Sequence, residues 1–486
     1  MNNKLEAVII GAGFGGVGMA IRLMQAGIDS FVILEKGEDV GGCWRENTYP
    51  GAACDVPSNL YSFSFEPNPN WTRRFAPQAE IFAYLRHCAR KYNVYPKVRF
   101  GCEVEQARYD DASQRWSVTT RNGEHYDSRL VIAATGQLNR PAMPQLGGEE
   151  RFTGSRFHSA RWDHDVDLRG KRVGVIGTGA SAIQFVPAIM DKVASLTLFQ
   201  RSAAYVLPKP DRAYTPLEQK LFDKLPAIQK FSRGAIYSFY ETRVFGFSGF
   251  DKAMAIYRLR AQQHMRRAVK DATKRAQLTP DYPIGCKRIL LSNDYFEALA
   301  QDKASIVTDR IQGFTEKGLA TADGREHAFD VIIYGTGFQA TDFLAPMRIT
   351  GRDGVDLNQA WRDGAEAYYG MTVHGFPNLF MLYGPNTNLG HNSIVYMLES
   401  QFNHVMSCLD SMEQTGAGAI EVRETVQASF NAALQEQIRA TVWDQGCTSW
   451  YKNESGKNTN NWPGFTFRYR QAIRTVKADD YEFSSR

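Results

Sequence analysis

Two residues of opposite charge, Glu35 and Arg201, hold the same place in two similar stretches of the sequence. Each lies 22 residues after the second glycine of a short glycine-rich turn, Gly13 in the first stretch and Gly179 in the second. In a dinucleotide-binding unit, a carboxylate at this place accepts hydrogen bonds from ribose hydroxyls and repels a 2′-phosphate. A guanidinium binds a 2′-phosphate instead. The pair predicts one dinucleotide without a 2′-phosphate and one NADP; an unpartnered surface arginine is the alternative for Arg201.

The first glycine-rich turn follows a short apolar run at residues 7–10. Gly11, Gly13 and Gly16 complete the pattern G-x-G-x-x-G, and a helical stretch comes next. The first glycine permits a tight turn, the second lets the backbone approach a pyrophosphate, and the third lets the helix pack against the strand. The free N–H groups at the start of the helix then bind the anion. These features predict a dinucleotide-binding unit.

The second turn, Gly177, Gly179 and Ala182, has similar surroundings, because a strand-like run at 172–176 precedes it. Two further apolar runs, 130–137 and 331–338, contain Thr-Gly at their ends and are typical of buried parallel strands. We expect these strands to return the chain to the two turns. The sequence thus predicts an α/β fold with two Rossmann-like domains, in which two bound cofactors meet and exchange electrons.

Composition limits the remaining classes of protein. The chain has 486 residues, 43% of them hydrophobic, and a formal charge of +5, which is too small to indicate a nucleic-acid partner. The apolar run near the N-terminus is too short for a signal peptide or a membrane span. The seven cysteines form no C-x-x-C pair and their number is odd, so we expect free thiols in a reducing compartment. We expect a soluble cytoplasmic protein.

A motif between the two turns resembles the fingerprint of a known family. Residues 152–163 fit F-x-G-x-x-x-H-x-x-x-W followed by Asp, through Phe152, Gly154, His158, Trp162 and Asp163. With the flavin-wrapping stretch 41–65, this resembles the type I Baeyer–Villiger monooxygenases, a family of class B flavoproteins, and the likeness extends to 446–465. The resemblance implies FAD at the first turn and NADPH at the second. It also implies insertion of one oxygen atom of O2 next to a ketone carbonyl, giving an ester or lactone.

By the same resemblance, Arg288 is the active-site arginine, which would stabilise an anionic flavin peroxide and the tetrahedral adduct. Asp55 matches the acid that positions this arginine, and a plain structural ion pair is the alternative. Lys287 matches a contact to the NADP phosphate. Ile289 stands where proline often follows the arginine, which leaves the shape of the substrate pocket open.

Other cofactor contacts are carried over from matching motifs. The further FAD contacts implied are Trp44, Asp55, Tyr61, the backbone at Val104, and Ile394. The NADP contacts implied are Gly177, Thr178, Gly179, Ala180, Ser181, Ala182, Gln184, Arg201, Ser202, Lys287, Arg288 and Trp450, the last closing over the nicotinamide side. No metal site is expected.

We expect residues 1–140 and 339–486 to form the FAD-binding domain, and residues 141–210 and 284–338 the NADP-binding domain. Residues 211–283 are expected to be a helical insertion that caps the active site. The fingerprint would lie in the loop that connects the two domains. There His158 would couple their movements; an acid–base role for this histidine is the alternative.

Within the insertion, apolar residues at steps of three or four predict an amphipathic helix. The apolar positions are Met254, Tyr257, Ala261, Met265, Ala268 and Ala272. We expect them to face the core, with the basic face in solvent. A helix lying on a membrane surface is the alternative, and membrane contact is not expected.

Three other functions would share parts of this pattern. A flavin-containing monooxygenase that oxidises nitrogen or sulfur usually has Phe or Tyr where this chain has Trp162, and would keep the peroxide protonated. A disulfide reductase would need a C-x-x-C pair. A non-catalytic NADPH-sensing or membrane-docking flavoprotein would not need Asp55 and Arg288, and it predicts no substrate-dependent NADPH consumption.

Overall fold

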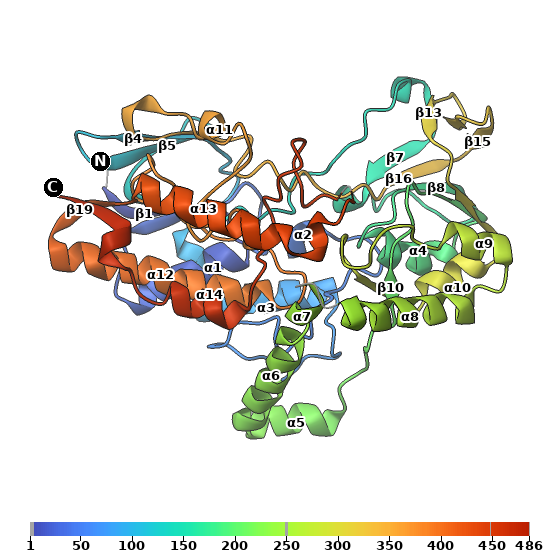
Figure 1. Ribbon diagram of the computed structural model, residues 1–486, viewed down its shortest axis with the longest axis horizontal. Coiled ribbons are helices and arrows are strands. Elements are labelled where there is room, and N and C mark those ends of the chain that lie inside the picture. Colours follow the sequence, from blue (N-terminus) through green and yellow to red (C-terminus); the bar gives the residue numbers. More distant parts are fainter. Residues whose placement is uncertain (1–3, 248–250, 448, 486) are drawn as a thin grey trace.

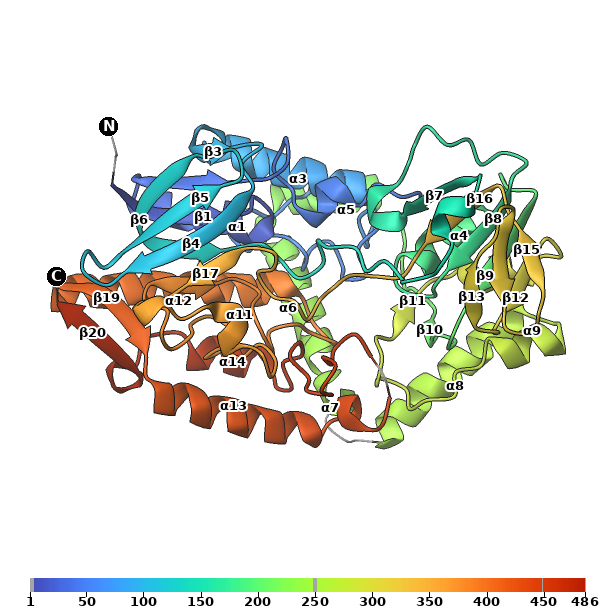
Figure 2. The ribbon, with the colours of Figure 1, turned by 90° about the horizontal axis from the view of Figure 1, so that it is seen from above.

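A computed structural model describes residues 4–247, 251–447 and 449–485 of the chain. Figures 1 and 2 show two β-sheets at opposite ends of the molecule, each with its own helices, joined by long crossing segments. Within the described residues no helix is long and apolar enough to cross a membrane.

The first sheet has a parallel centre, in the order β3–β2–β1–β6, and antiparallel strands on one side. Its strands are β1 (Leu5–Ile10), β2 (Phe31–Leu34), β3 (Val98–Arg99), β4 (Val104–Asp110), β5 (Arg115–Thr120), β6 (His125–Ala133), β17 (Arg348–Thr350) and β18 (Leu379–Met381). Its central residues are almost completely buried because helices cover one face and later chain segments the other. Helix α1 (Phe14–Gln25) follows β1 at the first glycine turn and packs against α12 (Ile394–Thr415).

The second sheet is entirely parallel, in the order β12–β9–β8–β16–β7. Its strands are β7 (Ser155–His158), β8 (Arg172–Ile176), β9 (Ser195–Phe199), β12 (Ala304–Val307) and β16 (Val331–Tyr334). Helix α4 (Ala182–Met190) follows β8 and the second glycine turn. Two sheets with parallel centres, in each of which a strand, a glycine turn and a helix follow one another, confirm the expected fold class, and β6 and β16 confirm the two return strands.

The place of the fingerprint differs from the expectation of a connecting loop. Residues 155–158 form β7, an edge strand of the second sheet, because they pair in register with β16. The strand contains a single apolar residue, Phe157, so the sequence shows no strand pattern at this place. Only the residues after His158 leave the sheet, through a short 3-10 turn at Ser159–Arg161.

The insertion is helical. In Figure 1 its helices α5 and α6 project from the body of the molecule, with α5 at the far end, whereas α8 and α9 lie beside the second sheet. Its helices are α5 (Pro216–Lys224), α6 (Pro226–Glu241), α7 (Val244–Phe247), α8 (Asp251–Ala268) and α9 (Ala272–Gln277). In α8 the apolar positions Met254, Ala261 and Met265 are buried, as expected. Ala272 is exposed, contrary to the pattern, because α8 ends at Ala268 and Asp271 caps a new helix there.

Candidate active site

A cavity of about 1410 Å³ is lined by residues from both glycine turns. This volume exceeds the roughly 300–1,000 Å³ of a usual small-molecule pocket, so there is room for two dinucleotides and a substrate. Of the cofactor contacts expected from the sequence, all except Gly16 and Ala182 line this cavity. From the insertion, Tyr282 belongs to the wall; that the insertion caps the site stays a prediction.

The first turn has the geometry that a pyrophosphate requires. Gly11 has φ +98°, and a β-carbon on it would lie 2.8 Å from the carbonyl oxygen of Ala134. A β-carbon on Gly16 would lie 1.9 Å from the carbonyl oxygen of Gly11, which explains why this glycine packs the helix and does not face the cavity. A β-carbon on Gly13 would lie 3.6 Å from the nearest backbone atom, the Cα of Gly42. The turn is therefore open toward the cavity at its second glycine, as FAD would need.

Glu35 directly follows strand β2, and both oxygens of its carboxylate accept hydrogen bonds at this turn. Its Oε2 accepts a hydrogen bond from the backbone N–H of Ala12 at 2.8 Å, and its Oε1 accepts from Gly37 N–H at 2.8 Å and from Arg45 Nη1 at 3.0 Å. The side chain is buried, yet it lines the cavity. An oriented acceptor at this place suits ribose hydroxyls.

The expected flavin-side contacts also meet at the cavity. Trp44 Nε1 donates a hydrogen bond to the hydroxyl of Tyr61 at 3.2 Å, and the two rings meet edge to face. Val104 and Ile394 approach from the start of β4 and the start of α12. These residues come from four separate segments, so the fold assembles a wall that no single motif encodes.

The second turn repeats the geometry of the first. Gly177 has φ +108°, and a β-carbon there would lie 2.4 Å from the carbonyl oxygen of Gly335. A β-carbon on Gly179 would lie 3.8 Å from its nearest neighbour, the carbonyl oxygen of Gly335, so this side of the turn stays open. Ala182 starts α4 and is completely buried against the sheet, which is why it lies outside the cavity wall. The turn fits a second pyrophosphate at the start of α4.

Two basic side chains, Arg201 and Lys287, line the cavity near the second glycine turn. Lys287 Nζ donates a hydrogen bond to Ser202 Oγ at 2.8 Å. Burial and the nearby charge of Arg201 lower the pKa of Lys287. Within the described residues neither cation takes part in an ion pair. Two unpaired cations that repel each other on a cavity wall suit a phosphate dianion, as the 2′-phosphate of NADP would supply.

Arg288 and Asp55 meet on the same wall. The Nε of Arg288 donates to Asp55 Oδ2 at 3.1 Å, and Nη2 donates to the same oxygen. The exposed fractions of the two side chains, 28% and 32%, face the cavity. Burial alone would raise the pKa of Asp55, but the Arg288 charge and hydrogen bonds hold it below its ordinary value. The Asp55 charge in turn raises the pKa of Arg288, so both groups are ionised.

Two residues near this pair were not found from the sequence. Tyr451 lies against Arg288, and burial raises the pKa of its phenol to about 12, against the lowering effect of Arg288. Lys209 adds positive charge that helps to lower the pKa of Asp55. Lys209 belongs to no motif, and Tyr451 lies in the stretch 446–465, whose pattern does not show that this side chain meets Arg288.

The structure corrects the expectation that all cysteines are free thiols. Cys286 and Cys447 form a disulfide across 161 residues, with their Cα atoms 6.2 Å apart. The remaining cysteines are free. No sequence spacing signals this pair, because folding alone brings the two segments together. The bond connects the loop that carries Arg288 to the segment that carries Trp450.

The fingerprint histidine is buried beside the crossing segment, the stretch of chain that contains Phe338 and runs from β16 in the second sheet to β17 in the first. His158 Nδ1 accepts a hydrogen bond from Ala160 N–H at 3.0 Å, and its ring lies 6.0 Å from that of Phe338. Burial lowers the pKa of His158 to about 4, against the raising effect of the Gly337 backbone. The imidazole is therefore neutral at physiological pH. It does not line the cavity, which disfavours the acid–base alternative.

The other fingerprint residues have packing roles. A β-carbon on Gly154 would lie 2.5 Å from the carbonyl oxygen of Asp330. Trp162 is buried, with its ring 5.4 Å from that of Phe185 on α4. Phe152 packs 5.9 Å from Phe314. The exposed Asp163 accepts a hydrogen bond from the N–H of Asp165, which closes a local turn.

Gln184 joins the two domains directly. Its Nε2 on α4 donates to the carbonyl of Ala53 at 2.9 Å, and its Oε1 accepts from the Tyr49 hydroxyl at 2.9 Å. Both partners lie close to Asp55 in the chain. Both polar atoms of the Gln184 side-chain amide are thus hydrogen-bonded to the segment at Tyr49 and Ala53, although the residue also lines the cavity.

Comparison with known proteins agrees with this geometry. Residues 8–225 match the family described as pyridine nucleotide-disulphide oxidoreductase. Over 482 residues the chain is 48% identical to a Baeyer-Villiger monooxygenase of Pseudomonas aeruginosa, with 99% of this chain and 92% of the relative covered. A Baeyer-Villiger monooxygenase of Streptomyces coelicolor is 44% identical over 484 residues, covering 99% and 93%.

Solved structures show the same likeness over the whole chain. A closed crystal structure of cyclohexanone monooxygenase superposes with a TM-score of 0.90 at 28% identity, with 100% of both chains covered. An oxidised steroid monooxygenase bound to NADP superposes with a TM-score of 0.89 at 30% identity, again with 100% of both covered.

Proposed function

Because the chain belongs to the type I Baeyer–Villiger monooxygenases, we propose that Arg288 and Asp55 form the centre at which it inserts oxygen next to a ketone carbonyl. The protein is an FAD-dependent, NADPH-consuming monooxygenase. The observation that supports the residue assignment is that this ion pair lies on the wall of the cavity that both glycine turns share.

The residues of the chain hold and orient the cofactors and the substrate and shield them from water, while the cofactors supply the chemistry. When bound, NADPH supplies a hydride and FAD activates O2 for transfer to the ketone. Arg288 places a fixed positive charge where negative charge develops on the transferred and carbonyl oxygens. Asp55 accepts both hydrogen bonds from the guanidinium and so fixes its direction. Because this pair is already formed, its orientation costs nothing at the moment of reaction.

Arg201, Lys287 and Ser202 form the proposed site for the 2′-phosphate of NADPH. The lysine and the arginine supply the charge, and the Ser202 hydroxyl holds the lysine ammonium in place. Glu35 gives the first turn the opposite preference. The two cofactors are thereby directed to opposite ends of the cavity.

Gln184 and His158 are proposed to couple the two domains. Gln184 ties α4 to the segment that leads to Asp55, so a movement at the NADP turn is transmitted to the reacting centre. His158 packs against the crossing segment at Phe338. A small ketone as partner, without nucleic acid, completes the proposal. A cytoplasmic location stays a prediction from the sequence, and the Cys286–Cys447 disulfide does not support it, because disulfides are rare in a reducing compartment.

The oxygenation of nitrogen or sulfur by a flavin-containing monooxygenase is the alternative activity, and a product assay separates the two. The purified protein, saturated with FAD, is incubated with NADPH and with linear, cyclic and aromatic ketones, sulfides and amines in turn. We expect NADPH oxidation coupled to an ester or lactone, identified by mass spectrometry. Oxygenation of sulfides and amines without any ester would contradict the proposal, and substrate-independent NADPH consumption would contradict a coupled oxygenase.

A further inference from the structure

Exposed apolar side chains are concentrated on the helical insertion. Among the described residues, nine of the thirteen large hydrophobic side chains that are exposed lie between positions 217 and 259. Six of them form the tip and outer side of the α5–α6 hairpin, which we define by Leu217, Leu221, Leu225, Ile228, Phe231 and Phe239. Patches of this kind mark interaction surfaces when they are contiguous.

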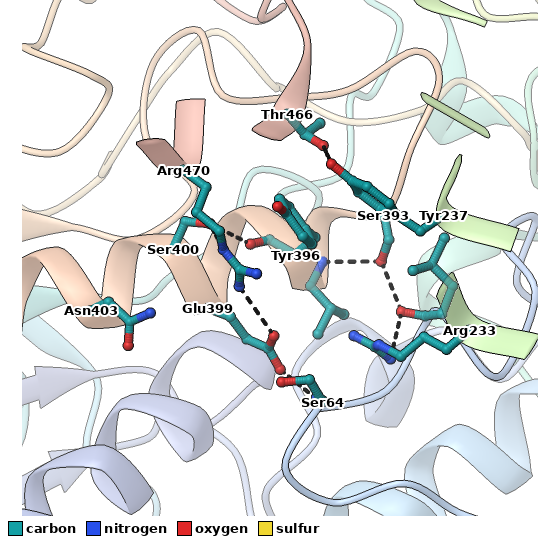
Figure 3. A network of polar contacts seen from close by, with 12 residues as sticks. Ser64, Arg233, Tyr237, Ser393, Tyr396, Glu399, Ser400, Asn403, Thr466 and Arg470 are labelled. Atoms are coloured by element: carbon teal, nitrogen blue, oxygen red, sulfur yellow. Dashed lines mark hydrogen bonds and ion pairs between the residues drawn. The ribbon is translucent and has the colours of Figure 1, made fainter. Parts of the chain in front are cut away.

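One face of α6 is already fixed on the FAD-binding domain. Arg233 Nη1 donates to the carbonyls of Asn59 and Ser62 at 2.8 and 2.9 Å. Tyr237 hydrogen-bonds Thr466 at 3.0 Å (Figure 3). The Tyr237 ring also stacks on Tyr396 with centroids 4.7 Å apart. These contacts fix which side of the helix faces outward.

The outward side of α6 is apolar. Ile228, Phe231 and Phe239 recur at the spacing of one helical face, about a third of a turn or more away from Arg233 and Tyr237. Phe231 is 79% exposed and Phe239 58% exposed. On α5, Leu217 and Leu221 are four residues apart and so share one helical face, with Leu217 66% exposed. The hairpin projects from the body of the molecule, so its tip is convex (Figure 1).

The charge of the insertion is also unusual. Residues 211–283 contain 14 Lys and Arg against 7 Asp and Glu, a charge of +7, whereas the rest of the chain carries −2. Lys220, Lys224 and Lys230 lie within the hairpin, beside its exposed apolar residues. The positive charge of the whole protein therefore belongs to the insertion.

We propose that the α5–α6 hairpin binds the surface of an anionic lipid bilayer, with its apolar side chains among the acyl chains and its lysines at the phosphates. A projecting helix pair with Leu and Phe on one side and Lys beside them has the amphipathic character of segments that lie in a membrane interface. A convex tip suits a deformable bilayer better than the pocket of a folded partner. From the sequence, membrane contact is not expected, and the amphipathic pattern indicates α8 and not α5 or α6.

Vesicle sedimentation of the FAD-loaded enzyme tests the proposal. We expect the protein to sediment with phosphatidylcholine vesicles that contain phosphatidylglycerol, less with phosphatidylcholine alone, and less again as salt screens the lysines. Phe231→Ser should lower partition about tenfold or more, because a phenyl ring is no longer transferred from water. Val355→Ser, which alters an exposed apolar residue far from the insertion, should leave partition unchanged.

A second set of variants separates charge from apolar contact. Replacing Lys220, Lys224 and Lys230 together by Gln should remove the preference for phosphatidylglycerol while leaving residual binding. For every variant, the visible flavin spectrum and NADPH oxidation without vesicles should match the parent, which shows that folding is intact.

Three results would overturn the proposal. The parent could stay in the supernatant with both kinds of vesicle, or Phe231→Ser could sediment as well as the parent. The third is concentration-dependent self-association that Phe231→Ser abolishes, seen by sedimentation velocity without any vesicle binding. That result would assign the same surface to a second copy of the chain.

Discussion

Asp55 and Arg288 are separated by 233 residues, yet one carboxylate oxygen of Asp55 accepts hydrogen bonds from both Nε and Nη2 of Arg288. The aspartate belongs to the segment between α2 (Cys43–Glu46) and α3 (Gln78–Lys91), and the arginine to the loop before β11 (Leu290–Leu291). The fold brings an acid from the FAD-binding side to a base from the NADP-binding side. The reacting centre is therefore sensitive to how the two domains are placed.

Arg288→Ala should separate the two halves of the reaction. Flavin reduction by NADPH should continue, because the hydride passes directly between cofactors. Ester formation should fall about a hundred- to a thousandfold, because developing negative charge loses a preorganised cation. Rapid-mixing absorbance measures the first step and chromatography of the ester the second. Asp55→Ala should show a smaller loss, since the arginine remains but is less well directed.

A surface arginine provides the control for this variant. Arg172 pairs with Asp330 at 2.8 Å on the exposed side of the second sheet. Arg172→Ala should therefore keep both rates within about twofold, because solvent screens an exposed ion pair and Arg172 does not line the cavity. If Arg288→Ala makes ester at the rate of the parent, the assignment of Arg288 is wrong.

Arg201→Ala tests the preference for NADPH. Loss of a charge-assisted hydrogen bond costs about 1.5–3 kcal/mol, so the KM for NADPH should rise roughly ten- to a hundredfold. The KM for NADH should hardly change, because NADH has no 2′-phosphate, and this makes NADH the internal control. Lys287→Ala should act in the same direction. Equal losses with both cofactors would show that these residues do not bind the 2′-phosphate.

The two glycine turns and their ribose-binding residues could be predicted from the sequence because each is local. A strand, a turn with close backbone contacts and a helix follow one another within about 30 residues, and Gly11 and Gly177 show the backbone conformation that the pattern requires. Glu35 and Arg201 follow at fixed spacing. The Arg288–Asp55 pair came only from resemblance, since nothing local links two residues so far apart.

What the sequence could not predict depends on long-range packing. The strand at 155–158 exists because β16 pairs with it, and four residues of mixed polarity carry no periodic signal of their own. Tyr451 and Lys209 reach the site from separate segments. The exposure of the apolar side of α6 could not be predicted, because the sequence of a helix does not show which of its faces packs against the rest of the protein.

The Cys286–Cys447 bond is open to a direct chemical test. Alkylation of the denatured protein without reductant should modify five cysteines, and after reduction seven. A cross-link that closes a loop of this length stabilises a protein by about 2–5 kcal/mol, so Cys286→Ser together with Cys447→Ser should lower the Tm. Cys102→Ser changes a free thiol and serves as the control. Seven modified cysteines before reduction would show that the bond is absent from the purified protein.

His158, the histidine of the fingerprint, should make the stability of the protein depend on pH. Its pKa lies near 4 when folded and near 6.5 in the ordinary state, because burial disfavours the imidazolium. Between these values the unfolded chain binds the additional proton. The neutral histidine therefore imposes no penalty above pH 6.5, and the free energy of unfolding falls as the pH drops from 6.5 toward 4.

His158→Gln should make this fall shallower, by at most about 2 kcal/mol after allowance for solvent near the ring. Thermal unfolding at several pH values measures the effect, with the exposed His125 replaced by Gln as the control. The same variant should keep its FAD, because His158 lies outside the cavity wall, while turnover with NADPH declines through weaker coupling of the domains. Stoichiometric loss of flavin from His158→Gln, measured by its visible spectrum, would instead place the residue in the FAD site.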